Sequence, residues 1–392
     1  MVMEVLFWLC LVLVVYTYVG YGMVLCLLVS IKKKLAHQAD NTMDEQREWP
    51  EVTLLICAYN EEEVVEMKMD NTRRLDYPQG KLKVMWVTDG SNDHTNDKLS
   101  TYEEVTVVYC PERQGKTAAL NHGISECTTE LVIMTDANTQ LNSQAIKEMV
   151  KPFNDPKVSC VAGEKRVMAR EESQTAAQGE GAYWKYESQL KKWDDALYSA
   201  MGCAGELCAI RKALYEPMAK DTLLDDFEMS MKTLMKGYRI AYTSDAYAME
   251  YGSANIEEES KRKKRIAAGG LQSIWRLRAL LNPFAHPIVA FQFVSHRVLR
   301  WSITPIALLA LIPINVWLVF NKAGIIYHII WVMQLLFYLA AFLGYLLDKR
   351  GRKISILYIP YYFLFMNINV FKGMSYLMQH RNNGAWEKAQ RG

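Results

Sequence analysis

The residues with the clearest chemical potential are Asp136 and Asn138, which stand two positions apart in the segment LVIMTDANT (131–139). The apolar residues before them predict a short buried strand that ends at this polar pair. Ligands of open α/β sheets gather at that edge. A carboxylate and an amide oxygen suit Mg²⁺ or Mn²⁺, which can in turn hold a diphosphate. The alternative interpretation is an Asx-rich turn that binds nothing.

Further candidate residues stand at or just beyond the ends of the neighbouring predicted strands, at positions from which a sheet edge can grip a nucleotide. These residues are Ala58, Tyr59, Glu61 and Asp89. A tight turn around Gly90 is the alternative for Asp89. Lys116 follows Gly115 at a predicted helix start, where backbone N–H groups and an ammonium suit a diphosphate. An exposed lysine in a first turn is the alternative there.

The segments that must position these residues alternate between apolar runs and helical patterns. Strands are predicted at 52–58, 82–88, 105–109 and 131–135, with 158–162 and 239–243 extending the sheet. Helices are predicted at 61–72, 115–123 and 174–193. This order predicts an α/β domain with a mostly parallel sheet.

Long apolar runs at both ends indicate a membrane protein. The run 5–29 is uncharged and long enough to cross the hydrocarbon core, and it lacks the basic start of a signal peptide. Lys32, Lys33 and Lys34 follow it, which places the next segment in the cytoplasm. We therefore expect a multi-pass protein of the cell (inner) membrane.

The expected organisation has seven parts. They are a transmembrane helix (1–31), a linker (32–50), a cytosolic α/β domain (51–254), amphipathic interfacial helices (255–300), two transmembrane helices (301–347), a transmembrane or re-entrant segment (354–378) and a tail (379–392).

Composition excludes some functions. The formal net charge is +2, with acidic and basic residues interspersed, so no electrostatic case for nucleic acid exists. The eight cysteines show no CxxC pair and no spacing typical of metal ligands, which indicates reduced, buried thiols.

Six motifs, taken in this order, resemble the membrane-embedded family 2 glycosyltransferases, which include cellulose, hyaluronan, chitin and poly-N-acetylglucosamine synthases. The motifs are ICAYNEE (56–62), TDGSNDHT (88–95), RQGKTAALNHG (113–123), TDANT (135–139), LLDDFEMS (223–230) and KRKKRIAAGG (261–270). The resemblance implies a Rossmann-like GT-A domain, a nucleotide-sugar donor and a divalent metal.

The same resemblance implies roles for further residues. Asp226 matches the catalytic base of the family's TED signature, with Asp225 as the second candidate, although Leu224 replaces the threonine. Two acids that complement a helix dipole are the alternative. The family's basic signature, usually QxxRW, appears here as residues 262–266. Arg265 keeps the arginine that would face the donor phosphates, Arg262 is a second candidate for donor binding, and Ile266 replaces the tryptophan.

The loop at Gly205 and Glu206 resembles the family's acceptor-facing loop. We therefore expect an inverting glycosyltransferase that uses UDP-N-acetylglucosamine or UDP-glucose and a glycan or lipid-linked acceptor. Polymerisation and export of a β-linked polysaccharide, with a second copy, a partner protein or membrane lipid involved, is left open. The alternative hypothesis is a non-catalytic, membrane-anchored sensor or assembly subunit that binds a nucleotide sugar.

Overall fold

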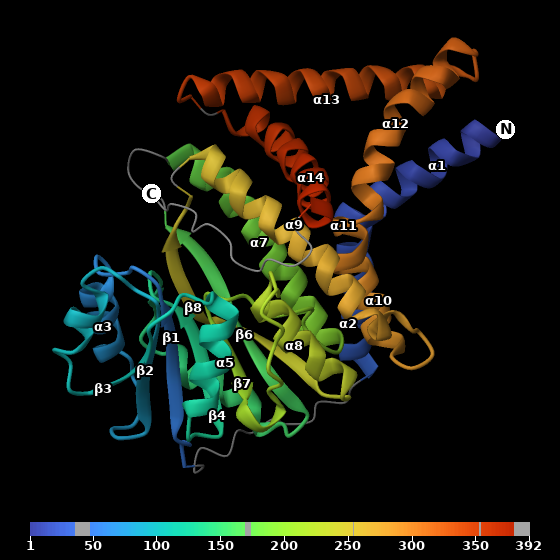
Figure 1. Cartoon of the computed structure of the whole chain (residues 1–392). Helices are drawn as coiled ribbons and strands as arrows, with labels where there is room; N and C mark the ends of the chain where they lie inside the picture. The colour runs from blue at the N-terminus through green and yellow to red at the C-terminus, as the bar shows by residue number, and fades with distance from the viewer. Residues whose placement is uncertain (36–47, 169–173, 254, 353, 380–392) are drawn as a thin grey trace.

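The computed structural model describes residues 1–35, 48–168, 174–253, 255–352 and 354–379, with backbone alone for 174–183. Most of the predicted linker and tail therefore lies outside the described residues. An eight-stranded sheet forms one part of the molecule, and long helices gather on one side of it (Figure 1). The strands are β1 (Val52–Ala58), β2 (Leu82–Asp89), β3 (Val105–Cys110), β4 (Leu131–Asp136), β5 (Gln140–Leu141), β6 (Val158–Met168), β7 (Cys208–Arg211) and β8 (Arg239–Tyr251).

The strand order is β3-β2-β1-β4-β7-β6-β8-β5. Strands β3, β2, β1 and β4 are mutually parallel, and β6 pairs in parallel with β8. This confirms the predicted mostly parallel sheet. Strand β7 lies antiparallel between β4 and β6, and β5 pairs antiparallel with β8; neither strand was predicted from the sequence. The parallel register brings the ends of β1, β2 and β4 to one edge.

Helices cover both faces of the sheet, which explains why its strands are continuous apolar runs. Leu54 and Ile56 face a core shared with α3 (Val65–Arg73), α4 (Thr95–Leu99) and α6 (Ala145–Val150). Leu55 faces the opposite core, against α5 (Lys116–Glu126) and α8 (Asp225–Met235). Successive residues of β1 are thus buried on opposite sides, and each leucine stabilises the fold by about 1.5–3 kcal/mol.

The segment predicted to be interfacial shares the second of these cores. It contains α9 (Ile256–Arg276), η5 (Arg278–Leu281), α10 (Pro287–Phe293), η6 (Val294–Val298) and α11 (Leu299–Trp301). Leu277, Leu280 and Phe293 join the same cluster as Phe227 of α8. Asn255 caps α9 by accepting hydrogen bonds from the N–H groups of Glu257 and Glu258. The helix therefore begins at Ile256, at the start of the segment 255–300 in which interfacial helices were predicted.

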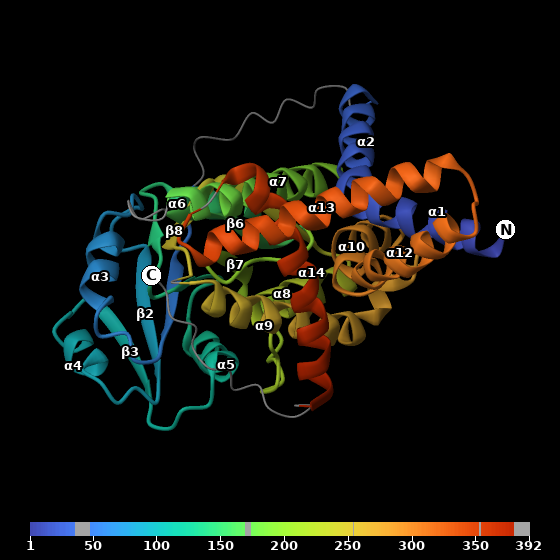
Figure 2. The same cartoon turned by 90° about the horizontal axis from the view of Figure 1, so that it is seen from above.

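Within the described residues, three helices are long and apolar enough to cross a membrane, which confirms the prediction of such helices at both ends. They are Val2–Leu35, comprising α1 (Val2–Val15), η1 (Tyr16–Gly20) and α2 (Tyr21–Leu35); α12 (Ile303–Phe320); and α13 (Ile325–Lys349). Figure 2 shows α1 and α12 at one end of the molecule and α13 running from that end back across it.

The ambiguous segment 354–378 forms one continuous helix, α14 (Ser355–Gln379), which is not among these three. It packs mainly on α9 and α13. Asn367 accepts a hydrogen bond from Tyr18 and Asn369 accepts one from Ser260, so both amides join α14 to other helices. Whether α14 crosses the membrane stays a prediction. The other long helix, α7 (Gln174–Leu197), lies between the sheet and α2.

Candidate active site

The loops after β1 and β2 are fastened to each other at the sheet edge. The side chain of Asn60 donates to Asn92 Oδ1 at 2.7 Å and accepts from the Asn92 N–H at 3.0 Å. The N–H of Glu61 donates to Thr95 Oγ1 at 2.9 Å. The Arg113 guanidinium lies 3.9 Å from the ring centre of Tyr59. Ala58, Tyr59 and Glu61, predicted to contact the donor, are thus held beside the loop that leads to α5.

Asp89 orders that loop. Its buried carboxylate accepts hydrogen bonds from the N–H groups of Gln114 at 2.8 Å and Gly115 at 2.7 Å. Gly115 has φ 94°, a left-handed conformation that favours glycine, and it caps α5. Lys116 therefore stands as the first residue of α5, at the helix end that favours anions. A direct donor contact by Asp89 stays a prediction.

Lys116 forms ion pairs with two of the other predicted site residues. Its Nζ lies 2.6 Å from Asp136 Oδ1 at the end of β4 and 4.0 Å from Asp225 Oδ2 at the start of α8. Burial lowers the pKa of the ammonium, but the charges of Asp136, Asp225 and Asp226 outweigh it, so the pKa is raised. The same residues and Gly205 line a small cavity of about 10 Å³, roughly the size of one water molecule.

Asp226 has the environment of a proton acceptor. Burial and the neighbouring charge of Asp225 raise its pKa to about 7, against the lowering effect of Lys116. A Cβ atom at Gly205 would lie 3.5 Å from Asp226 Oδ2 and 3.0 Å from Lys116 Nζ. The absence of a side chain at Gly205 therefore keeps the approach to both groups open. A carboxylate with a pKa near neutrality suits general base catalysis.

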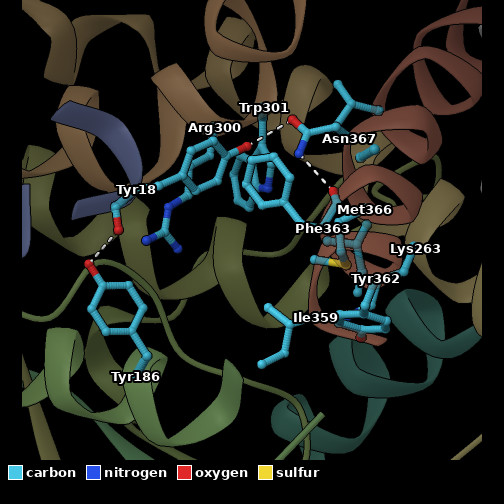
Figure 3. Close-up of a pocket in the computed structure, with 13 residues that line it drawn as sticks. Tyr18, Tyr186, Lys263, Arg300, Trp301, Ile359, Tyr362, Phe363, Met366 and Asn367 are labelled. Carbon is cyan, nitrogen blue, oxygen red and sulfur yellow. Dashed lines mark hydrogen bonds between the residues drawn. The ribbon is translucent and has the colours of Figure 1, made fainter. Parts of the chain in front are cut away.

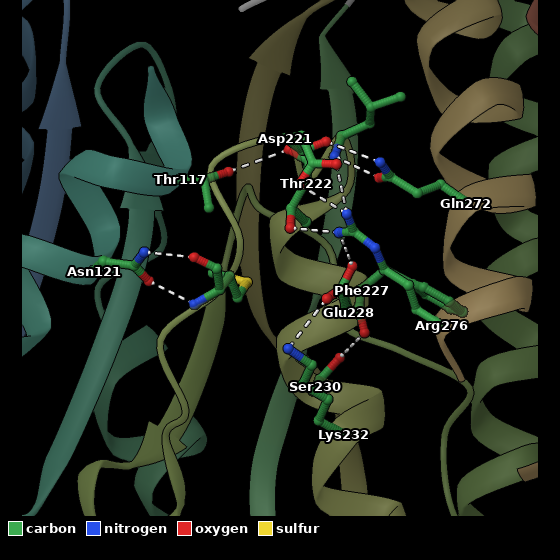
Figure 4. Close-up of polar contacts among 12 residues, drawn as sticks. Thr117, Asn121, Asp221, Thr222, Phe227, Glu228, Ser230, Lys232, Gln272 and Arg276 are labelled. Atoms are coloured by element: carbon green, nitrogen blue, oxygen red, sulfur yellow. Dashed lines mark hydrogen bonds and ion pairs between the residues drawn. The ribbon is translucent and has the colours of Figure 1, made fainter. Parts of the chain in front are cut away.

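Helix α9 holds the loop in front of the two acids (Figure 4). Arg276 forms a bidentate ion pair with Asp221 at 2.8 Å and a second ion pair with Glu228 of α8 at 2.9 Å. Gln272 Nε2 donates to the Asp221 carbonyl, and its Oε1 accepts from the Leu223 N–H. Neither of these two α9 residues was predicted from the sequence to belong to the site. The sequence feature that could have revealed them is their spacing of four residues, which places both side chains on one face of the helix.

Lys68 also positions the site, and it was not predicted from the sequence. This lysine of α3 is fully buried, and its Nζ donates to the carbonyl of Thr139 at 2.8 Å and to the hydroxyls of Thr135 and Thr139 at 3.2 Å. It thereby holds the turn that carries Asp136 and Asn138. Burial lowers the pKa of the ammonium to about 7. The sequence feature that could have revealed this role is the position of the lysine, next to Met69 on the apolar face of α3.

Glu206 and Arg262 lie in a buried ion-pair cluster next to the acid pair. Lys165 Nζ lies 2.6 Å from Glu206 Oε1 and also contacts Glu250, while Arg262 lies 3.4 Å from Glu206 and 3.8 Å from Glu250. These charges already compensate one another. Acceptor contact by Glu206 and phosphate contact by Arg262 therefore stay predictions, as does the role of the half-buried Arg265.

The residues predicted to hold a metal fit a small, hard cation. Asp136 supplies a carboxylate, and Asn138 supplies a half-buried amide for which no hydrogen bond is seen among the described residues. Those residues contain no group of three or more His, Cys, Asp or Glu arranged to hold a metal. Mg²⁺ commonly takes one or two protein ligands and fills its shell with water and substrate phosphates. Two ligands at this sheet edge are compatible with that arrangement.

The mixed sheet covered on both faces, the polar residues at its edge and the apolar helices at both ends define a GT-A glycosyltransferase with membrane-spanning segments. Residues 50–269, more than half of the chain, match the family described as "Glycosyltransferase like family 2". The chain belongs to this family.

Curated relatives include the poly-beta-1,6-N-acetyl-D-glucosamine synthase of Staphylococcus aureus strain COL, 27% identical over 256 residues that cover 63% of this chain and 60% of the relative. The probable glycosyltransferase YdaM of Bacillus subtilis strain 168 is 25% identical over 239 residues, which cover 58% of this chain and 56% of that protein. The chain thus spans about three fifths of the length of these relatives.

Among solved structures, a mannosyltransferase from Pyrobaculum calidifontis, PcManGT in complex with GDP-Man and Mn2+, has a similar fold. Its TM-score is 0.70 and its sequence identity is 21%, and the match covers 96% of this chain and 100% of that chain. This similarity extends to the helices outside the sheet domain.

Proposed function

We propose that this protein is an inverting glycosyltransferase that moves a sugar from a UDP-sugar to an acceptor at the membrane. The observation that carries the proposal is Asp226, a half-buried carboxylate with a pKa near 7 beside the Lys116 ammonium. One group accepts a proton and the other binds a diphosphate, and the two lie across a single small cavity. The transfer requires both tasks at one place.

The proposed reaction is a single displacement. Lys116, at the N-terminus of α5, binds the donor diphosphate in exchange for its ion pair with Asp136. Asp226 takes the proton of the acceptor hydroxyl while the acceptor oxygen attacks the anomeric carbon on the face opposite the diphosphate. Asp225 keeps the pKa of Asp226 high enough for this role. Mg²⁺ or Mn²⁺ held by Asp136 and Asn138 would neutralise charge on the leaving diphosphate.

The donor is proposed to be UDP-N-acetylglucosamine or UDP-glucose because a curated relative is a poly-N-acetylglucosamine synthase. GDP-mannose is the competing donor, since the similar archaeal structure contains it. Membrane vesicles containing Mg²⁺ or Mn²⁺ should release nucleoside diphosphate from only one of the three. Asp226→Asn should keep donor binding and lose transfer, whereas the exposed Asp245→Asn should match the wild type. Release from none of the donors would refute the assignment.

We further propose that the sheet domain lies in the cytoplasm. Lys32, Lys33 and Lys34 end α2, and Lys32 Nζ donates to two carbonyls at the end of α7, so the basic end of the first span meets the catalytic domain. With Cys26→Ser as background, Ser100→Cys should react with an impermeant maleimide only in inverted vesicles. Asn321→Cys, between α12 and α13, should react only in spheroplasts. The reverse pattern would refute this orientation.

A further inference from the structure

A cavity of about 320 Å³ lies where the catalytic domain meets the apolar helices (Figure 3). Helix α14 contributes Ile359, Phe363, Met366 and Val370, which recur at helical spacing and so form one face. Helix α9 contributes Ile266, the residue at the position of the family signature's tryptophan. The cavity has the size of a small-molecule site, and apolar side chains form most of its wall.

Most of the polar groups on the wall already have partners. The Asn367 amide accepts from the Tyr18 hydroxyl at 2.8 Å and donates to the Phe363 carbonyl at 2.9 Å. The Tyr186 hydroxyl donates to the Tyr18 carbonyl at 2.8 Å. Arg300 pairs with Glu187 at 2.9 Å. A sugar chain in the cavity would lose most of its hydrogen bonds to water without replacing them, whereas a hydrocarbon chain would lose none.

The cavity reaches the vicinity of the proposed base. The Trp301 ring forms part of its wall and packs edge-on against Phe227, with ring centres 5.1 Å apart. Phe227 directly follows Asp226 in α8. One layer of aromatic side chains thus separates the apolar cavity from the acid pair. For a molecule with its chain in this cavity, the polar end reaches Asp226 only past these two rings.

We propose that this cavity binds the hydrocarbon chain of a membrane lipid whose head-group hydroxyl is the sugar acceptor. The proposal rests on the proposed function and specifies its acceptor. A hydroxyl, unlike a lipid phosphate, keeps its proton at neutral pH and so needs the base that Asp226 supplies. The acceptor oxygen forms the bond to the anomeric carbon, and the hydroxyl proton passes to Asp226. The bond from that carbon to the diphosphate breaks, and its electron pair leaves with the nucleoside diphosphate.

The test fills the cavity with a larger side chain. Full-length wild type, Met366→Trp and Ile368→Trp are placed in vesicles of total lipid from the native membrane with radiolabelled donor. Ile368 lies on the exposed side of the same helix and serves as the matched control. We expect Met366→Trp to lower the ratio of organic-phase sugar to hydrolysed donor at least tenfold, with Ile368→Trp unchanged. Equal ratios in the two variants would overturn the proposal.

A second arm offers a water-soluble chito-oligosaccharide instead of the lipid. Transfer to this acceptor alone by the wild type would overturn the lipid proposal and leave the proposed function intact. Met366→Trp could instead lose transfer to lipid, transfer to the soluble acceptor and thermal stability together. That result would show that the lipid has a structural role only, and it would also overturn the lipid-acceptor proposal. Failure of the wild type to consume any donor would instead refute the proposed function.

A third measurement needs no turnover. Wild-type protein in detergent is irradiated with a diacylglycerol that carries a diazirine in its acyl chain, and the labelled peptide is mapped. We expect labelling within α14, with a large decrease in Met366→Trp. Phosphatidylcholine with the same diazirine chain has no free hydroxyl and serves as the bulk-lipid probe. Equal labelling by the two lipids, or labelling outside the cavity, would overturn the proposal.

Discussion

Lys116 Nζ lies 2.6 Å from Asp136 Oδ1 and thereby joins the first turn of α5 to the carboxyl end of β4. Asp225 and Asp226 approach the same ammonium from α8. Three elements that are distant in sequence thus place three carboxylates around one positive charge. A bound diphosphate would compete with these carboxylates for Lys116. The strength of this competition determines how tightly the donor binds.

Replacing Lys116 with methionine should raise the KM for the donor. Hydrogen bonds to charged groups contribute about 1.5–3 kcal/mol, which corresponds to roughly 10- to 100-fold in binding. Lys116→Arg should recover part of the loss, and the exposed Lys157→Met should behave as the wild type. Initial rates at varied donor concentration provide the measurement. An unchanged KM in Lys116→Met would exclude this lysine from donor binding.

The pH profile should report Asp226. A base works in its deprotonated form, so kcat/KM should rise with pH and reach half its maximum near the pKa of about 7. Asp225→Asn removes a negative charge that raises this pKa, so the rising limb should move to lower pH. Steady-state rates between pH 5 and 9 would test both, over roughly the range in which such a base titrates. If the rising limb of the pH profile lies at the same pH in Asp225→Asn as in the wild type, the two acids are not coupled.

Metal binding should depend on the residue at position 138. Asn138→Asp adds a negative charge and should tighten Mg²⁺ binding, while Asp136→Ala should abolish metal-dependent donor binding. Donor titrations by calorimetry, with and without Mg²⁺, measure both effects. Donor affinity that is the same in EDTA would remove the metal from the mechanism.

Arg276 should act on the acid pair through the loop that precedes it. Arg276→Met removes the ion pairs to Asp221 and Glu228 and should lower kcat at least tenfold while donor affinity changes little. The buried Glu228 carboxylate then has fewer partners, so the free energy of unfolding should decrease by about 1–3 kcal/mol. Arg278→Met, an exposed position nearby, is the control. A larger effect on donor affinity than on kcat would contradict a positioning role.

A buried polar cluster should stabilise the junction between the first apolar helix and the catalytic domain. His296 lies within hydrogen-bond distance of Asp194 on one ring nitrogen and Glu187 on the other, and Tyr21 of α2 donates to Asp194. His296→Leu leaves two buried carboxylates undercompensated and should destabilise the protein by about 3–5 kcal/mol. Exposed His122→Leu should have little effect on the melting temperature of the detergent-solubilised protein. Equal melting temperatures in the two variants would contradict this role.

The sequence by itself determined the elements whose signals are local. Strands buried on both faces are continuous apolar runs, as in Leu131–Asp136. A helix that crosses a membrane is a long uncharged run. Both kinds of element were therefore predicted at the positions where the structure has them. The resemblance to family 2 glycosyltransferases also implied that Lys116, Asp136 and Asp226 belong to one site. The structure brings these three residues together at a single cavity.

Only the tertiary structure decided the features that arise from pairing between distant segments. Four-residue β7 is a strand because β4 and β6 lie on either side of it, and its own sequence is too short to carry a pattern. Lys68 is buried because the Thr139 turn, 71 residues away in sequence, accepts its hydrogen bonds. The cavity beside Trp301 exists because α9, α11 and α14 converge there. Such contacts follow from the packing of whole elements, and local sequence patterns do not encode them.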